Sequence, residues 1–208
     1  MILIGQYDSP FVRRVGIALT LYGLPFEHRP WSVFGDAEKI RPYNPLTRVP
    51  TLVLDDGEAL IDSHAMLDYL DSLAPADRRL FPAGEPARRQ AVKVAALASG
   101  LAEKAVSLFY ELRLHKDASE VWVNRCLTQI SGALAVLEAD RAGRASAYWF
   151  GDNIGHADIV VATVLRHLND AHPALVDMAD FPALAAHAAR LEALPVFKAI
   201  SQPFIAPT

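Results

Sequence analysis

The sequence predicts two domains, an α/β domain over residues 1–78 and an all-α domain over residues 88–208, joined by a linker at 79–87. Three observations predict this division. Short apolar runs alternate with helical patterns before residue 78, and every pattern after the linker is helical. Between them, the segment PADRRLFPAGEPA holds three prolines and a glycine, residues that interrupt regular elements and are typical of a domain boundary.

The first two elements are a strand and a helix whose ends are both marked. Met1–Gly5 is a short apolar run typical of a buried strand, and the following segment repeats apolar residues on one helical face. Ser9 suits the N-cap and Pro10 the first helical position, while Gly23 suits the position after the last turn. The sequence therefore predicts a helix that begins at Pro10 and ends just before Gly23.

The other elements of the α/β domain follow in short alternation. We expect a strand in Pro25–Arg29, a helical turn near Asp36–Ile40, a hairpin of Thr51–Leu54 and Glu58–Ile61 around an Asp-Asp-Gly turn, and a helix opened by Asp62 and Ser63. The order β-α-β-α-β-β-α combines one βαβ unit with a terminal hairpin. That combination predicts a mixed sheet.

Five helical segments account for the second domain. They are Arg88–His115, Ser119–Arg141, Ala157–Ala171, Phe181–Leu194 and Val196–Ser201. The third is the most apolar and is expected to be the buried helix of the domain. A full capping box would need Ser or Thr three residues before Asp158, but Gly155 occupies that position, so only the half of the capping box supplied by Asp158 is expected.

Composition excludes several classes of protein. With 208 residues and 52% apolar side chains the chain can bury a sizeable core, and a net charge of −4 offers no basic surface for nucleic acid. One cysteine, Cys126, excludes a disulfide framework and a cysteine-rich metal site, and the histidines lack metal-ligand spacing. We find no signal peptide and no apolar run long enough for a membrane span, so we expect a soluble cytoplasmic protein without a metal.

Four segments resemble the cytosolic glutathione S-transferase superfamily, in its bacterial Ser-Pro-Phe type. They are Ser9–Val15 (SPFVRRV), Asn44–Leu52 (NPLTRVPTL), Asp62–Leu70 (DSHAMLDYL) and the Gly151–Ile159 segment that opens the buried helix. Their order and spacing over most of the chain carry the resemblance. It implies a thioredoxin-like N-terminal domain, an all-α C-terminal domain and a homodimer that binds glutathione and a hydrophobic small molecule.

The resemblance places glutathione along the first domain. Val49-Pro50 would form a cis-proline turn, with the N–H and C=O of Val49 pairing with the cysteinyl unit. Ser63 and its N–H would bind the γ-glutamyl carboxylate, with Asp62 near the ammonium. The start of a helix favours an anion because free N–H groups converge there, although both residues could be plain helix caps. Arg48 is expected to meet the glycyl carboxylate or to be solvated.

Ser9 is the expected catalytic residue. A free thiol with a pKa near 8.5 is only about 3% ionised at pH 7, so an enzyme must stabilise the thiolate. A hydroxyl that donates to a charged acceptor contributes about 1.5–3 kcal/mol, and a helix N-terminus adds up to about 1 kcal/mol. Ser9 stands where both can act. Tyr7, two residues earlier, is the rival donor.

The electrophile pocket is expected, by resemblance, between the two domains. Phe11, which is also expected at the glutathione site, would line it with Phe109, Tyr110 and Trp122, although such aromatic residues are more often core. Similar bacterial sequences read Ala-Asp-Gly where this chain has Ala98-Ser99-Gly100. With that acidic group missing, Glu103 is the nearest candidate for a residue that a partner subunit contributes to the glutathione site.

The leading hypothesis is a glutathione transferase in which Ser9 stabilises the thiolate for attack on a hydrophobic electrophile. A glutathione-dependent isomerase or peroxidase would use the same thiolate on another substrate. A non-catalytic ligand-binding or interaction protein of the same fold is the alternative from a different class. Retention of Ser9, Val49-Pro50 and Asp62-Ser63 favours the enzyme.

Overall fold

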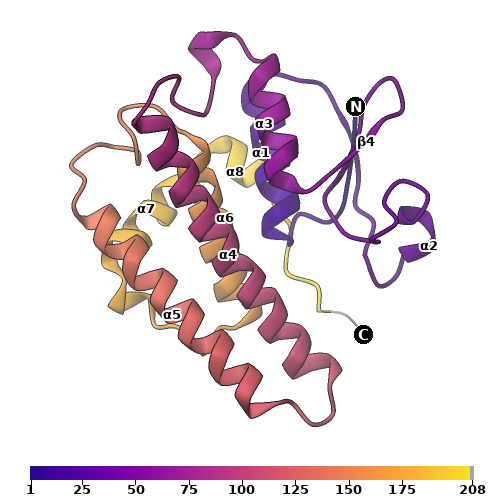
Figure 1. The fold of residues 1–208 in the computed structure, drawn as a ribbon, viewed down its shortest axis with the longest axis vertical. Helices are drawn as coiled ribbons and strands as arrows, with labels where there is room; N and C mark the ends of the chain where they lie inside the picture. Colours follow the sequence, from indigo (N-terminus) through magenta and orange to yellow (C-terminus); the bar gives the residue numbers. More distant parts are fainter. Residues whose placement is uncertain (207–208) are drawn as a thin grey trace. The chain divides into compact units, whose positions relative to one another are not determined.

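A computed structural model describes residues 1–206 and confirms the predicted fold class, a mixed α/β part and a helical part. Two compact units are present (Figure 1). The first comprises Met1–Ala83 together with the chain from Ala193 onward, and the second comprises Gly84–Glu192. The second unit differs from the expected 88–208 domain at its C-terminal end, because the helix after Ala193 packs on the first helix of the chain.

A four-stranded mixed sheet forms the centre of the first unit. Its strands are β1 (Ile2–Ile4), β2 (Glu27–Arg29), β3 (Thr51–Val53) and β4 (Ala59–Ile61), arranged in the order β2-β1-β3-β4. Strand β1 is parallel to β2 and antiparallel to β3, and β3 is antiparallel to β4. This is the predicted βαβ unit followed by a hairpin.

Four helices and one 3-10 turn complete the first unit. They are α1 (Pro10–Tyr22), α2 (Ala37–Ile40), α3 (Ser63–Leu73), the 3-10 turn η1 (Ala76–Arg78) and α8 (Pro195–Ala199). Figure 1 shows α1 and α3 on one side of the sheet and α2 on the other. Successive side chains of a strand point to opposite faces. Leu3 accordingly faces Gly16 of α1, whereas Ile4 packs with Ile40 of α2.

Helix α1 begins and ends at the predicted residues. The Ser9 side chain accepts a hydrogen bond from the N–H of Val12, and Pro10 occupies the first helical position. Gly23 has a φ of +71°, in the left-handed region that glycine adopts readily. The N–H of Leu24 donates to the carbonyl of Leu19 (3.0 Å), which closes the last turn.

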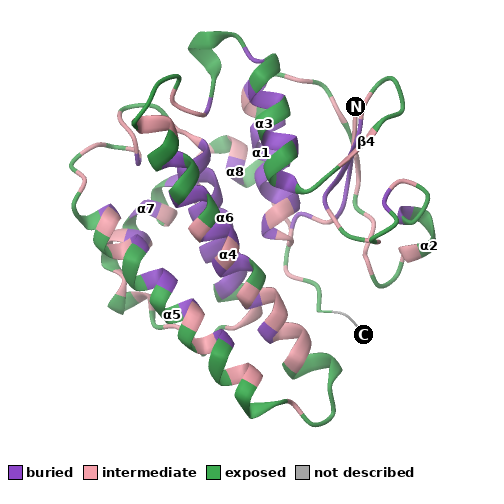
Figure 2. Ribbon diagram, in the orientation of Figure 1, coloured by how far each residue is buried: buried purple, intermediate pink, exposed green. Residues whose placement is uncertain are grey.

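Four longer elements and one short turn form the second unit. They are α4 (Ala87–Leu114), α5 (Glu120–Ala142), α6 (His156–Ala171), the 3-10 turn η2 (Met178–Asp180) and α7 (Pro182–Glu192). Helix α4 packs against α5 and α6, and α7 packs against α5 and α6. Figure 2 shows that α6 is buried along most of its length, as its apolar sequence predicted.

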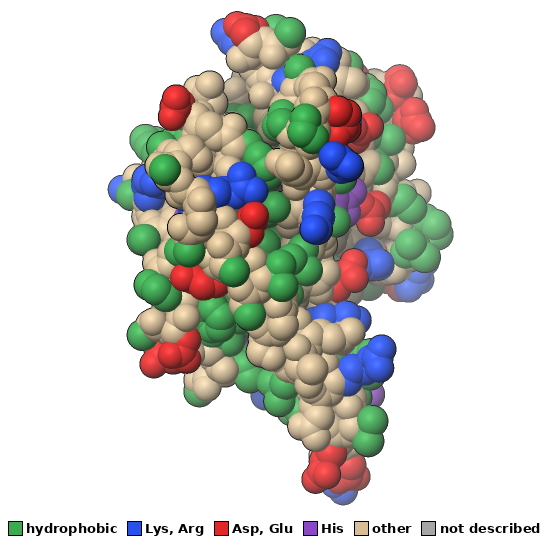
Figure 3. Space-filling model, turned by 60° about the vertical axis from the view of Figure 1, so that its left-hand side comes forward, with side chains coloured by type: hydrophobic (Ala, Val, Ile, Leu, Met, Phe, Trp, Pro, Cys, Tyr) green, Lys and Arg blue, Asp and Glu red, His purple; other side chains and the backbone are tan. Residues whose placement is uncertain are grey.

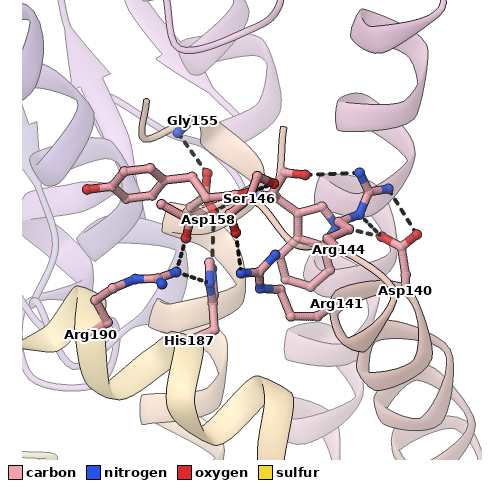
Figure 4. A network of polar contacts seen from close by, with 11 residues as sticks. Asp140, Arg141, Arg144, Ser146, Gly155, Asp158, His187 and Arg190 are labelled. Carbon is pink, nitrogen blue, oxygen red and sulfur yellow. Dashed lines mark hydrogen bonds and ion pairs between the residues drawn. The ribbon is translucent and has the colours of Figure 1, made fainter. Parts of the chain in front are cut away.

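The start of α6 is fixed by a buried carboxylate (Figure 4). Asp158, which is 1% exposed, accepts hydrogen bonds from the N–H groups of Gly155 (2.9 Å) and Trp149 (2.7 Å). The bond from Gly155 is the expected half of the capping box. Nε2 of His187 on α7 lies 3.1 Å from Asp158 Oδ1, and Nδ1 of the same ring lies 3.0 Å from Arg190. The Asp158 carboxylate thus links the start of α6 and the backbone at Trp149 to α7.

A second carboxylate, Asp140, ties the end of α5 to the same connection (Figure 4). Both of its oxygens accept from the Arg144 guanidinium at 3.0 Å, and Oδ2 also accepts from the indole N–H of Trp149 (2.5 Å). Burial alone would raise the pKa of Asp140, but the bonds from Arg144 and Trp149 outweigh it and hold that pKa below its usual value.

Candidate active site

The candidate site begins at the turn between β1 and α1. The N–H of Ser9 donates to the carbonyl of Gln6 (3.2 Å), so Gln6–Ser9 form a closed turn with Tyr7 and Asp8 at its centre. Ser9 is half-buried and extended, and its Oγ lies 3.4 Å from the N–H of Val12, which donates to it. A hydroxyl that accepts in this way keeps its own proton for another partner. Ser9 therefore caps α1 and can donate to a ligand at the same time.

Asn44 organises the loop before β3. This residue is 1% exposed, and its amide donates to the carbonyl of Arg48 (2.9 Å) and to Oγ1 of Thr51 (3.1 Å). Its own Oδ1 accepts from the N–H of Leu46 (3.0 Å). In the sequence Asn44 is only the first residue of the Asn44–Leu52 segment, and nothing there indicates this function. All three hydrogen bonds join Asn44 to residues between 46 and 51, so its side chain ties the loop to the start of β3.

Val49 is half-buried in the same loop. The Val49-Pro50 peptide is cis, as expected, and the Val49 side chain packs on the cluster of Ile4, Ile40 and Val53. Within residues 1–206, neither the N–H nor the C=O of Val49 makes a hydrogen bond. Arg48 is exposed beside it. The backbone of Val49 thus has the donor and the acceptor that an added strand would need.

Gly5 brings this loop against the first turn of α1. Its φ is +128°, and a Cβ built on it would lie 2.5 Å from Cγ2 of Val12 and 2.8 Å from Cβ of Val49. Only a residue without a side chain allows so close an approach. The carbonyl of Gly5 also accepts from Nε2 of His28 (2.8 Å). Val49 and the first turn of α1 therefore meet across Gly5.

Ser63 contacts α1 from another side. It is 5% exposed at the start of α3, and its Oγ accepts from Nε of Arg14 (3.1 Å) and from Nη2 of the same guanidinium. Two bonds from Arg14 occupy the acceptor capacity of the hydroxyl, so its proton is directed to another partner. Asp62 is exposed, has a φ of +70° and accepts from the N–H of His64 (2.8 Å).

Arg14 is a site residue that sequence reasoning missed. It is 1% exposed, and its Cζ lies 5.7 Å from the ring centroid of Phe11. A buried guanidinium beside Ser63 adds positive charge to the N–H end of α3, which favours an anion there. The sequence offered no signal for this, because an arginine on a helix is usually solvated.

The ring of Tyr7, the rival donor, packs between β2 and α1. It stacks on His28 (centroids 3.8 Å apart, planes within 10°) and lies against Gly16, two turns along the helix. The ring is 9% exposed, and burial raises the pKa of Tyr7 to about 12. The phenol therefore stays protonated and packs as part of the core.

The aromatic residues expected at the electrophile pocket belong to both units. Phe109 and Tyr110 are neighbours on α4 with ring centroids 6.3 Å apart, and Phe109 also meets His172 (5.9 Å). The ring of Trp122 on α5 lies 5.6 Å from Nζ of Lys104. Phe11 belongs to the first unit, beside Arg14. The pocket itself stays a prediction.

Charged side chains of both signs are interspersed over the face drawn in Figure 3. Across residues 1–206 no three His, Cys, Asp or Glu side chains gather closely enough to hold a metal ion. In the same part of the chain, no helix is long and apolar enough to cross a membrane.

Comparison with known proteins identifies the family. Residues 3–79 match the N-terminal domain of glutathione S-transferase, and residues 120–190 match its C-terminal domain. The chain is 30% identical to glutathione S-transferase Z2 of Arabidopsis thaliana, over 94% of this chain and 88% of that one. It is 29% identical to the maleylacetoacetate isomerase of Pseudomonas aeruginosa, over 94% and 96% of the two chains.

A solved structure agrees over the whole length. The glutathione S-transferase of Methylobacterium radiotolerans, in complex with glutathione sulfonate, superimposes with a TM-score of 0.92 at 30% identity, covering 100% of this chain and 97% of that one. The chain belongs to the glutathione S-transferase family.

Proposed function

We propose that this protein is a glutathione transferase whose glutathione site lies in the first unit and uses Ser9 to stabilise the thiolate. One observation carries the proposal: the first five residues of α1 touch both other segments of the site. They meet Val49 across Gly5, and they meet Ser63 through Arg14. A donor for a thiol, a strand-like backbone and an anion site therefore surround one helix N-terminus.

Each part of glutathione has a matching group in this arrangement. The γ-glutamyl carboxylate takes the Ser63 hydroxyl, whose proton Arg14 leaves available, and the N–H of Ser63, which makes no hydrogen bond within residues 1–206. Asp62 is the acceptor for the ammonium. The cysteinyl backbone pairs with the N–H and C=O of Val49, which brings the sulfur toward Ser9. Exposed Arg48 is available to the glycyl carboxylate.

The reaction needs the sulfur as an anion. The thiol gives its proton to water, and Ser9 donates a hydrogen bond to the thiolate. The sulfur then attacks the carbon of a hydrophobic electrophile, so that an S–C bond forms and the leaving group departs with its electron pair. Tyr7, whose ring stacks on His28, is the rival donor against which Ser9→Ala is tested.

Calorimetric titration with glutathione and the ultraviolet absorbance of the thiolate test this assignment. Ser9→Ala removes a bond of about 1.5–3 kcal/mol to a charged acceptor, so we expect the pKa of the bound thiol to rise by about 1–2 and conjugation of an activated aryl chloride to fall about 10–100-fold. Ser63→Ala is expected to lose glutathione affinity. Ser72→Ala, on an exposed position of the same helix, is the matched control.

The outcomes separate the competing functions. An unshifted thiol pKa in the wild-type complex would indicate a non-catalytic glutathione-binding protein, and absence of glutathione binding would refute the proposal. A glutathione-dependent isomerase is the second candidate, favoured by the maleylacetoacetate isomerase relative. Maleylacetoacetate that isomerises only when glutathione is present, and not with Ser9→Ala, would support that activity.

A further inference from the structure

The chain after α8 returns to the turn that carries Ser9. Two residues anchor its path on α1. Nε of Arg13 donates to the carbonyl of Ile200 (2.8 Å), and Nη2 of Arg13 donates to the carbonyl of Phe197 (2.8 Å). Gly16 lets Ile200 pack closely, since a Cβ at Gly16 would lie 2.9 Å from Cγ2 of Ile200. The guanidinium of Arg13 is buried, so these contacts fix where the following residues lie.

Beyond this anchor, the chain contacts both central residues of the Gln6–Ser9 turn. The side-chain oxygen of Gln202 accepts from the N–H of Tyr7 (2.8 Å). The N–H of Ile205 donates to Oδ2 of Asp8 (3.0 Å). The two contacts hold Tyr7 and Asp8, the two residues immediately before Ser9.

Local geometry makes Gln202 suited to this contact. Pro203 follows it, and a residue before proline is restricted to extended backbone. The anchor at Ile200 lies two residues earlier. The side chain of Gln202 therefore starts from a fixed position. Its oxygen supplies the acceptor that the N–H of Tyr7 lacks within the turn, because the single backbone bond of the turn joins Gln6 and Ser9.

We propose that Gln202 is a positioning residue for Ser9: by holding the N–H of Tyr7, it keeps the turn in the conformation that aims the Ser9 hydroxyl at the glutathione thiol. This inference rests on the proposed function. It assigns part of the thiolate site to a segment almost 200 residues away in the sequence, acting through the N–H of Tyr7.

The test compares variants of Gln202 by the pKa of the bound thiol. Gln202→Leu removes the acceptor, and we expect the pKa of the bound thiol to move toward that of free glutathione. The thiolate fraction below that pKa then falls about fivefold, the factor that corresponds to losing one hydrogen bond of about 1 kcal/mol. The dissociation constant of glutathione changes less than twofold, because Ser63 and Val49 are untouched.

Two further measurements separate positioning from a general loss of structure. In a Ser9→Ala background, Gln202→Leu should have no additional effect on the thiol pKa, since the residue through which it acts is absent. Lys198→Ala, on an exposed position of α8, is the control and should behave as wild type. If Gln202→Leu does not fold, Gln202→Asn, whose amide is one methylene too short, replaces it with the same expected loss.

Failure of this inference differs from failure of the proposed function. A wild-type protein that does not lower the pKa of bound glutathione contradicts the proposed function. A wild-type protein that lowers it, with Gln202→Leu unchanged, contradicts only the positioning by Gln202. An equal effect of Gln202→Leu with and without Ser9 would also overturn it.

Discussion

Gly5→Ala tests whether the contact between the Val49 loop and α1 is as close as the structure shows. The added Cβ would lie 2.5 Å from Cγ2 of Val12 and 2.8 Å from Cβ of Val49. Rotation of the Val12 side chain relieves the first overlap. The second cannot be relieved in this way, because Cβ of Val49 moves only with its backbone. The loop and the helix therefore have to separate.

The magnitude follows from two contributions. Alanine at a φ of +128° costs about 1–3 kcal/mol in backbone strain. The overlap adds about 1–3 kcal/mol, the usual range for an overpacked core. We expect a loss of about 2–6 kcal/mol in the free energy of unfolding. That is a large part of the roughly 5–15 kcal/mol that stabilises a typical domain.

Urea unfolding followed by circular dichroism measures this loss, and calorimetry measures the effect on glutathione affinity. Gly57→Ala is the matched control, because Gly57 also has a positive φ (+93°) but nothing lies within 4 Å of its Cβ position. The difference between the two variants isolates the overlap. Equal destabilisation by both would refute the reasoning, and so would a Gly5→Ala protein that binds glutathione as tightly as wild type.

Three further substitutions test other contacts. Asp158→Ala leaves the N–H groups of Gly155 and Trp149 without an acceptor. We therefore expect thermal unfolding to show a loss of about 3 kcal/mol or more in the free energy of unfolding, and a loss below about 1 kcal/mol would contradict this. The pKa of Asp140 is lowered in the fold, so its stabilising effect is present above the ordinary aspartate pKa of 3.8 and is lost as pH falls below it. Asp140→Asn should therefore reduce the acid sensitivity of unfolding below about pH 4, and an unchanged pH profile would count against the Arg144 pairing. Asn44→Ala should weaken glutathione binding more than it lowers the unfolding temperature, since it frees the loop before β3; equal binding by both proteins would argue against that function.

Local signals predicted the elements well. Ser9, Pro10 and Gly23 marked both ends of α1, because caps act through bonds to neighbouring residues and can be seen in a short window. The same holds for the hairpin of β3 and β4 around its Asp-Asp-Gly turn. These features need no knowledge of distant contacts.

The site could be predicted only in part. Ser9 and Ser63 stand at helix starts, and the resemblance gave them functions that remain predictions. Arg14 and Gln202 could not be found in the sequence, because each acts through a contact across many residues, from α1 to α3 or from the chain after α8 back to Tyr7. Nothing in the local pattern distinguishes such side chains from solvated ones.

The return of the chain to α1 has a consequence for synthesis on the ribosome. The first unit needs Arg13 and Gly16 from one part of the chain and Ile200 from another. About 110 residues separate Ala83 from Ala193, the two ends of the interruption. At about 5–20 residues per second, the ribosome needs roughly 5–20 seconds to synthesise the residues between the two segments of the first unit. The helical unit, continuous in sequence, can therefore complete its fold before the α/β unit that precedes it.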